Sequence, residues 1–144
     1  MCPLVRVAVG ILATIGLTAV AVCAGPLTAG ELKGTWELVE VHSLPLPPTG
    51  ANARPVFTIT DQSIEGFDGC NNFSGRLDKP GSIASTRRGC VEGTVKLPLD
   101  LTDPMSHLKS GRIHNGTLIL PAREGIADSV FRRVKETPKH EVSR

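Results

Sequence analysis

Apolar and polar residues alternate over short stretches along most of the 144-residue chain. In residues 35–42, Trp36 and Leu38 fall on one side of the alternation and Val39 and Val41 on the other. A period of two predicts a β-strand rather than a helix. Similar short segments, rich in apolar and β-branched residues, recur at 56–60, 63–67, 71–77, 82–84, 112–114, 117–120 and 129–134. Short strands joined by frequent turns are typical of an antiparallel barrel or a sandwich-like meander.

Turn signals separate these segments. Asp61-Gln62 is a tight polar turn between two strand patterns and predicts a hairpin. Asn115-Gly116 predicts a type I′ hairpin turn, because both central positions of that turn need a positive φ. Residues 43–55 contain Pro45, Pro47 and Pro48, and proline excludes a central strand there, so we expect a loop.

Residues 97–111 contain the only helix that the sequence predicts. Asp103 can cap its N-terminus, Pro104 suits the first helical position and Gly111 can end it. The helix is barely two turns long, so packing against the rest of the fold must stabilise it. We therefore expect a mainly β fold, a small antiparallel domain with one short helix.

The first 24 residues have the pattern of a signal peptide. Arg6 precedes an apolar run, Val7–Val22, that is about as long as a signal-peptide core and shorter than most membrane spans. The alternative is an uncleaved N-terminal anchor. Cys23 is a disfavoured candidate for lipidation, because Val22 stands where a lipoprotein signal usually has a smaller residue. The expected organisation is a signal peptide (1–24), a flexible lead (25–31), one β domain (32–134) and a polar tail (135–144).

Charge and composition exclude several classes of protein. Lysine and arginine total 16 against 14 acidic residues, and the basic residues are scattered, so no nucleic-acid footprint is present. The four phenylalanines and one tryptophan are too few for a stacking platform, and we expect them in the core. We expect a monomer that contacts membrane only through its signal segment or a lipidated Cys23.

Several segments occur in an order that matches a known family. They are 34–38 (Gly-Thr-Trp-Glu-Leu), 66–75 (Gly-Phe-Asp-Gly-Cys-Asn-Asn-Phe-Ser-Gly), 85–90 (Ser-Thr-Arg-Arg-Gly-Cys), 116–120 (Gly-Thr-Leu-Ile-Leu) and 131–133 (Phe-Arg-Arg). Together they resemble the META domain, also called the HslJ-like domain, over residues 32–134. The Gly-x-x-Gly-Cys-Asn block is the most specific part of the resemblance.

The resemblance implies a lipocalin-like, partly open antiparallel barrel with a helix against one opening. It also implies a bacterial envelope protein loosely tied to heat or antibiotic stress, in a family not known for an enzymatic activity. One departure concerns residues 77–85, where the family usually has a longer hairpin. We expect one hairpin strand to be shortened there, which puts closure of the barrel in question.

Cys70 and Cys90 are the two cysteines that remain after cleavage at residue 24. In an exported protein, two cysteines indicate one disulfide. The alternatives are two packed thiols or a reactive or metal-binding pair. No Cys-x-x-Cys or His-x-x-x-His spacing accompanies them, so we predict neither a metal site nor a cofactor.

Four polar residues near these cysteines are candidates for binding. Asn71 and Asn72 either organise the glycine-rich turn or present amides to a ligand at the barrel mouth. Arg87 and Arg88 either grip an anionic partner or are solvated loop charges.

No catalytic residues are predicted. His42, His107, His114 and His140 are spread along the chain, and we expect them at the surface. No Gly-x-Ser-x-Gly motif accompanies the serines. The expected function is a non-catalytic envelope binding or interaction module, whose partner is an envelope protein or a small ligand. The alternative is a lipocalin-like carrier of a small apolar ligand, which would need a hollow interior.

Overall fold

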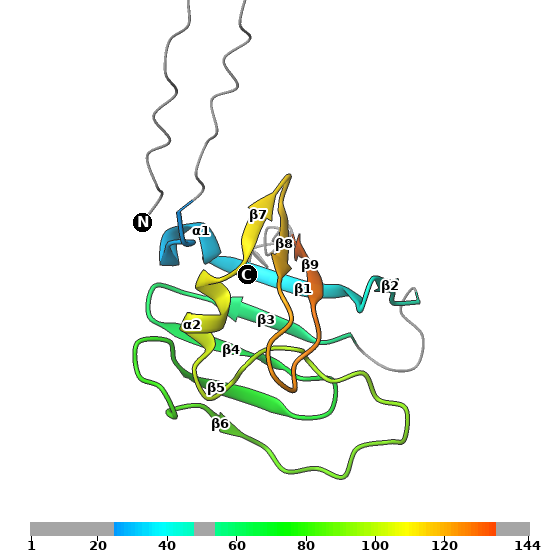
Figure 1. Cartoon of the computed structure of the whole chain (residues 1–144). Helices are drawn as coiled ribbons and strands as arrows, with labels where there is room; N and C mark the ends of the chain where they lie inside the picture. The colour runs from blue at the N-terminus through cyan, green and yellow to red at the C-terminus, as the bar shows by residue number, and fades with distance from the viewer. Residues whose placement is uncertain (1–24, 48–53, 135–144) are drawn as a thin grey trace, which may run out of the picture.

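A computed structural model describes residues 25–47 and 54–134 (Figure 1). Its strands and helices, in chain order, are α1 (Ala29–Leu32), β1 (Gly34–Val41), β2 (Leu44–Pro45), β3 (Val56–Ile59), β4 (Ser63–Phe67), β5 (Asn72–Arg76), β6 (Ala84–Ser85), α2 (Pro104–Lys109), β7 (Arg112–His114), β8 (Thr117–Leu120) and β9 (Ser129–Val134). The predicted signal peptide (1–24) and polar tail (135–144) lie outside the described residues. No helix in the described part of the chain is long and apolar enough to cross a bilayer.

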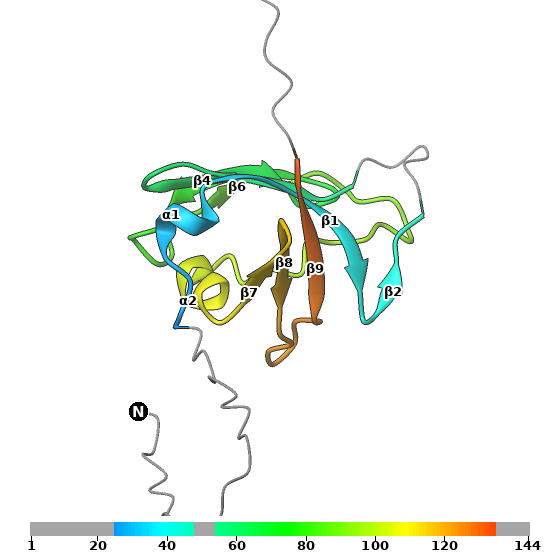
Figure 2. The same cartoon turned by 90° about the horizontal axis from the view of Figure 1, so that it is seen from above.

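The nine strands of residues 25–47 and 54–134 belong to one antiparallel sheet. Its order is β6-β5-β4-β3-β1-β9-β8-β7, and β2 pairs with β1. The sheet bends around the two helices, as the view from above shows (Figure 2). It does not close, because in the described residues β6 and β7 lie at its two ends without pairing. The prediction of a mainly β, partly open antiparallel barrel is confirmed.

Apolar side chains fill the space between the sheet and the helices. Trp36, Phe57 and Phe131 are fully buried at its centre. The rings of Phe57 and Phe131 meet edge to face, with centroids 5.1 Å apart, an arrangement that aromatic pairs favour. Leu32 from α1 and Leu108 from α2 close the core on the helical side.

The alternation predicted for β1 holds only over its first half. Trp36 and Leu38 are buried as expected. The register against β9 then shifts, so that Leu38 pairs with Phe131 and Glu40 with Val130. Val39 is the extra residue of a β-bulge, and a bulge reverses the alternation beyond it. Val41 therefore packs against the core, and the prediction that it shares a face with Val39 was wrong.

One turn prediction is confirmed, and one segment predicted to be a loop contains a short strand. Asn115 and Gly116 have φ values of 49° and 74° between β7 and β8, which confirms the type I′ prediction. In the segment predicted to be a loop, however, β2 pairs with the end of β1. The turn between them consists of His42 and Ser43, at φ 51° and 59°. The pair His-Ser is not among the dipeptides typical of a tight hairpin turn, so the sequence pattern did not reveal this hairpin.

The helices also differ in part from the prediction. In α2, Asp103 is the N-cap and Pro104 the first residue, as expected, but the helix ends at Lys109, before Gly111. The other helix, α1, was not predicted. Most of it lies in the segment predicted to be a flexible lead (25–31). Thr28 and Glu31 form a capping box there, and hydrogen bonds from Thr28 lower the pKa of the Glu31 carboxyl. The described residues thus contain two short helices, where the sequence predicted one.

Candidate functional site

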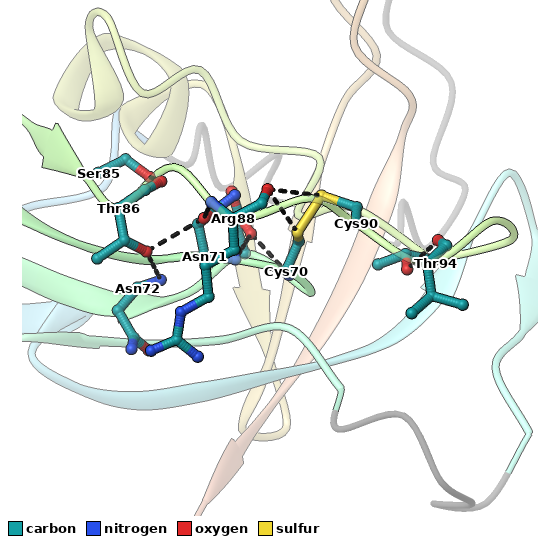
Figure 3. Close-up of a disulfide and its surroundings, with 10 residues drawn as sticks. Cys70, Asn71, Asn72, Ser85, Thr86, Arg88, Cys90 and Thr94 are labelled. Atoms are coloured by element: carbon teal, nitrogen blue, oxygen red, sulfur yellow. Dashed lines mark hydrogen bonds between the residues drawn. A yellow bond between two sulfur atoms is a disulfide. The ribbon is translucent and has the colours of Figure 1, made fainter.

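A disulfide joins Cys70 and Cys90 at one end of the sheet (Figure 3). Cys70 lies just before β5, and Cys90 follows β6 by five residues. Their Cα atoms are 5.4 Å apart. The predicted pairing is confirmed, and the reading as a pair of reactive or metal-binding thiols was wrong. In the described part of the chain, no group of three or more His, Cys, Asp or Glu side chains is placed to hold a metal ion.

The turn before Cys70 is built around Asp68. Its Oδ1 accepts the backbone N–H groups of Cys70, at 2.8 Å, and Asn71, at 2.6 Å. Its carbonyl oxygen accepts the N–H of Leu97, at 2.7 Å. Gly69 between them has φ +102°, and a Cβ there would overlap the carbonyl oxygen of Val95. The Gly-x-x-Gly-Cys-Asn block therefore serves a close crossing of two chain segments.

Asn71 ties this turn to the segment before Cys90. Its Oδ1 accepts the backbone N–H of Arg88, at 2.7 Å, and the hydroxyl of Thr86, at 3.1 Å. The Thr86 hydroxyl in turn accepts the backbone N–H of Asn72, at 3.1 Å. These contacts favour the reading of Asn71 as a residue that organises the turn.

The side chain of Asn72 is placed differently. It is exposed at the start of β5 and forms no hydrogen bond with any residue that the structure describes. Asn72 lines a shallow, open hollow of about 690 Å³ on the outer face of the sheet. The hollow spans β3 to β6 and is lined by Val56, Thr58, Glu65, Gly66, Phe67, Asn72, Phe73, Ser74, Ala84, Ser85 and Thr86.

Arg87 and Arg88 are exposed beside the disulfide. Within residues 25–47 and 54–134, neither guanidinium group pairs with a carboxylate or donates a hydrogen bond. The carbonyl oxygen of Arg88 lies 3.7 Å and 3.9 Å from the sulfurs of Cys70 and Cys90. Disulfide sulfurs carry no proton, so these are packing contacts. The four candidate residues thus divide into one bound amide, one exposed amide and two exposed cations.

The prediction that all histidines lie at the surface was wrong for His107, which is fully buried in α2. Its Nδ1 accepts the backbone N–H of Asp100, at 3.1 Å, and its Nε2 lies 3.2 Å from the carbonyl oxygen of Pro121. This pairing assigns the neutral ring with its proton on Nε2. Burial lowers the pKa of His107. His107 therefore joins backbone segments within the core.

The segments that open and close the domain also meet. The Arg133 guanidinium lies 4.3 Å from the centre of the Trp36 ring. It donates hydrogen bonds to the carbonyl oxygens of Glu31, at 2.7 Å, and Lys33, at 2.5 Å. The Trp36 Nε1–H donates to the carbonyl oxygen of Leu32, at 2.7 Å. Sequence reasoning gave no role to Arg133, because its partners are backbone atoms 100 or more residues away in the chain.

These features define a small β domain. Its antiparallel sheet is partly open, a disulfide joins two of its loops, and its first and last segments pack against each other. The sequence matches the META domain over residues 27–135, and the chain belongs to the META domain family. Neither the curated proteins nor the solved structures gave a match.

Proposed function

We propose that this META domain is a non-catalytic binding module of the bacterial cell envelope, exported by its N-terminal segment and supporting tolerance of heat or antibiotic stress. The observation that carries the proposal is the disulfide-braced end of the sheet. There Arg87 and Arg88 are exposed and have no carboxylate partner among the described residues.

The motif residues hold in place the loops that carry the arginine pair. The side-chain oxygens of Asp68 and Asn71 accept hydrogen bonds from backbone N–H groups of the same loops. Such contacts fix loop geometry, as a recognition surface needs, and rigid loops lose less entropy on binding. The guanidinium groups that the loops display favour a partner with carboxylate or phosphate groups.

Export is supported by the disulfide. Disulfides persist mainly in oxidising compartments such as the periplasm. Cys90 is exposed and Cys70 half-exposed, so reductants in the cytosol would have access to the bond.

The packed interior of the domain does not support the alternative function, a carrier of a small apolar ligand. A carrier needs a hollow core, whereas Trp36, Phe57 and Phe131 occupy the space under the sheet. The fold also holds α1 and α2 against this space, with Leu32 and Leu108 pointing into it. The filled interior therefore favours the binding module over a carrier.

The test is affinity capture from the native envelope, using the exported, oxidised protein as bait. We expect a specific partner to be retained by the wild type and lost by the double variant Arg87→Ala/Arg88→Ala. The matched control is Lys79→Ala/Arg112→Ala, which removes the same charge from two exposed sites elsewhere. Equal capture by both double variants would refute the role of the arginine pair, and recovery of the native protein from the cytosol would refute the envelope location.

A further inference from the structure

The side chains of four residues form a block on the outer face of the sheet, in the hollow next to the disulfide. They are Glu65, Phe67, Asn72 and Ser74. Glu65 of β4 pairs directly with Ser74 of β5, and Phe67 pairs with Asn72 (Figure 1 shows the two strands side by side). Residues two apart on a strand share a face, and directly paired Cβ atoms lie about 5 Å apart. The four side chains are therefore mutual neighbours, with Ile64 and Phe73 buried on the opposite face.

The polar side chains of this block have hydrogen-bonding groups that no described residue occupies. The side chains of Glu65, Asn72 and Ser74 make no hydrogen bond or ion pair with the described residues, although all three are exposed at the surface of the hollow. In contrast, the flanking hydroxyls of Thr58 and Thr86 are already bonded to Thr35 and Asn71. The block thus offers a carboxylate, an amide and a hydroxyl whose bonds are free for a ligand.

The charge and shape of the hollow limit the ligand. Among the described residues that line the hollow, Glu65 alone is charged, so the lining itself offers no cation to a phosphate or carboxylate ligand. A carboxylate accepts hydrogen bonds from hydroxyl groups, and an amide both donates and accepts. The ring of Phe67 is half-buried on this outer face, so the prediction that all the aromatic residues lie in the core was wrong for Phe67. It adds an apolar surface beside the polar groups. Ligands with many hydroxyl groups and an apolar ring face match this set.

We propose that the block formed by Glu65, Phe67, Asn72 and Ser74 binds a neutral sugar ring of a glycan. The C–H face of the sugar packs on Phe67, its hydroxyls donate to Glu65, and Asn72 and Ser74 bond the remaining oxygens. The hollow is open to solvent, so the rest of a glycan chain can extend past both ends. This inference rests on the proposed binding function and assigns a ligand class to it, at a surface next to the arginine pair.

The test is an NMR titration of the exported, oxidised protein with two soluble neutral probes, maltotriose and the trimer of N-acetylglucosamine. We expect saturable shifts of β4 and β5 amides with at least one probe. Asn72→Ala should weaken that binding about fivefold, the value for one lost hydrogen bond. The Asn72 side chain makes no hydrogen bond with the described residues, so the thermal unfolding of the variant should match that of the wild type.

Matched variants separate the outcomes. Glu65→Gln should weaken sugar binding severalfold, whereas Glu124→Gln, the same change on the exposed connection before β9, should leave it unchanged. Lack of saturable shifts with both sugars, shifts confined to other surfaces, or equal affinity of Asn72→Ala and the wild type would each overturn the inference. If a partner is still captured through Arg87 and Arg88 in that case, only the sugar site fails, and the binding function stands.

Discussion

At the scale of single residues, the side chains of His107 and Asn71 hold backbone segments in place. The imidazole of His107 pairs with one backbone donor and one acceptor from segments on either side of α2. In the disulfide loop, the Oδ1 of Asn71 accepts one backbone N–H and one hydroxyl. Leaving such groups without a partner costs about 1–3 kcal/mol each when they are buried. These residues therefore offer direct tests of what stabilises the fold.

His107 should make stability depend on pH. Its pKa in the folded state is lowered by burial, whereas an unfolded histidine titrates at about 6.5. The neutral ring therefore stabilises the fold fully above that pH, and this contribution falls as the pH drops through 6.5 toward the lowered value. We expect urea midpoints of the wild type to fall between pH 7.5 and pH 5.5.

The control for this prediction is His107→Asn, whose amide oxygen can accept the Asp100 N–H but cannot titrate. We expect the variant to be less stable at pH 7.5, because the Pro121 carbonyl loses its donor. Its urea midpoint should change less over the same pH range. An equal pH dependence in both proteins would show that other groups cause it.

The two adjacent asparagines provide a matched pair. Asn71→Ala removes the acceptor for the Arg88 N–H and the Thr86 hydroxyl, which lie in a partly exposed loop, so we expect a loss of about 1–2 kcal/mol in the free energy of unfolding. Asn72→Ala removes an exposed amide and should change it by less than about 0.5 kcal/mol. Urea unfolding of the oxidised proteins measures both values, and similar losses in the two variants would contradict the assignment.

The sequence could locate these asparagines but could not tell them apart. The Gly-x-x-Gly-Cys-Asn block indicated a turn with a cysteine at its end, and both were found. Which amide faces the protein depends on where residues 86–88 run, and that path is set by pairing with β5 rather than by local pattern. His107 was misplaced for a similar reason, since Asp100 and Pro121 become its partners only after α2 packs on the sheet.

At the scale of elements, the shortest ones depend most on distant contacts. The four-residue helix α1 is too short to form by itself, and Arg133 of β9 donates to two carbonyl groups at its end. The same guanidinium covers Trp36 of β1. A single side chain thus joins the first helix, the first strand and the last strand.

Arg133→Ala should therefore destabilise the domain by about 2 kcal/mol, through two charge-assisted hydrogen bonds and the contact with the Trp36 ring. The neighbouring Arg132→Ala is the control, because Arg132 only pairs with Glu37 at the surface. Surface ion pairs contribute about 0–1 kcal/mol. The measurement is urea unfolding, and equal losses in the two variants would refute the role of Arg133.

Elements with local signals were predicted well, and those without were missed. The Asn115-Gly116 hairpin and the start of α2 have turn and capping residues in the chain itself. The β2 hairpin uses His42 and Ser43 at positive φ, which only its pairing with β1 enforces. The bulge at Val39 depends on the register against β9, more than 80 residues further on, and no local period reports it.

At the scale of the whole molecule, the sheet is held at each end by different means. Strands β7 to β9 and β1 share a continuous buried face through Leu118, Phe131 and Leu38. The other end finishes with β6, only two residues long. The shortened hairpin at residues 77–85 thus leaves an edge with little pairing of its own, and the disulfide braces the chain just beyond it.

Breaking the disulfide should consequently destabilise the domain without unfolding it. The bond links residues 20 apart, and closing a loop of that size stabilises by about 3 kcal/mol, mainly by restricting the unfolded chain. The folded loops keep their hydrogen bonds from Asp68 and Asn71, which do not involve sulfur. We expect Cys70→Ser/Cys90→Ser to lower the free energy of unfolding by about 3 kcal/mol in urea, while the NMR shifts of β1, β8 and β9 stay unchanged. Adding Asn71→Ala to this variant should release residues 87–94, because the disulfide and the Asn71 amide tie this stretch to the turn before β5. Thr86 should stay in place, because its hydrogen bonds with Asn72 remain. Wild-type amide shifts of residues 87–94 after both changes would show that the contacts of Thr86 and Val95 suffice to hold this end, and that the disulfide stabilises only by restricting the unfolded chain.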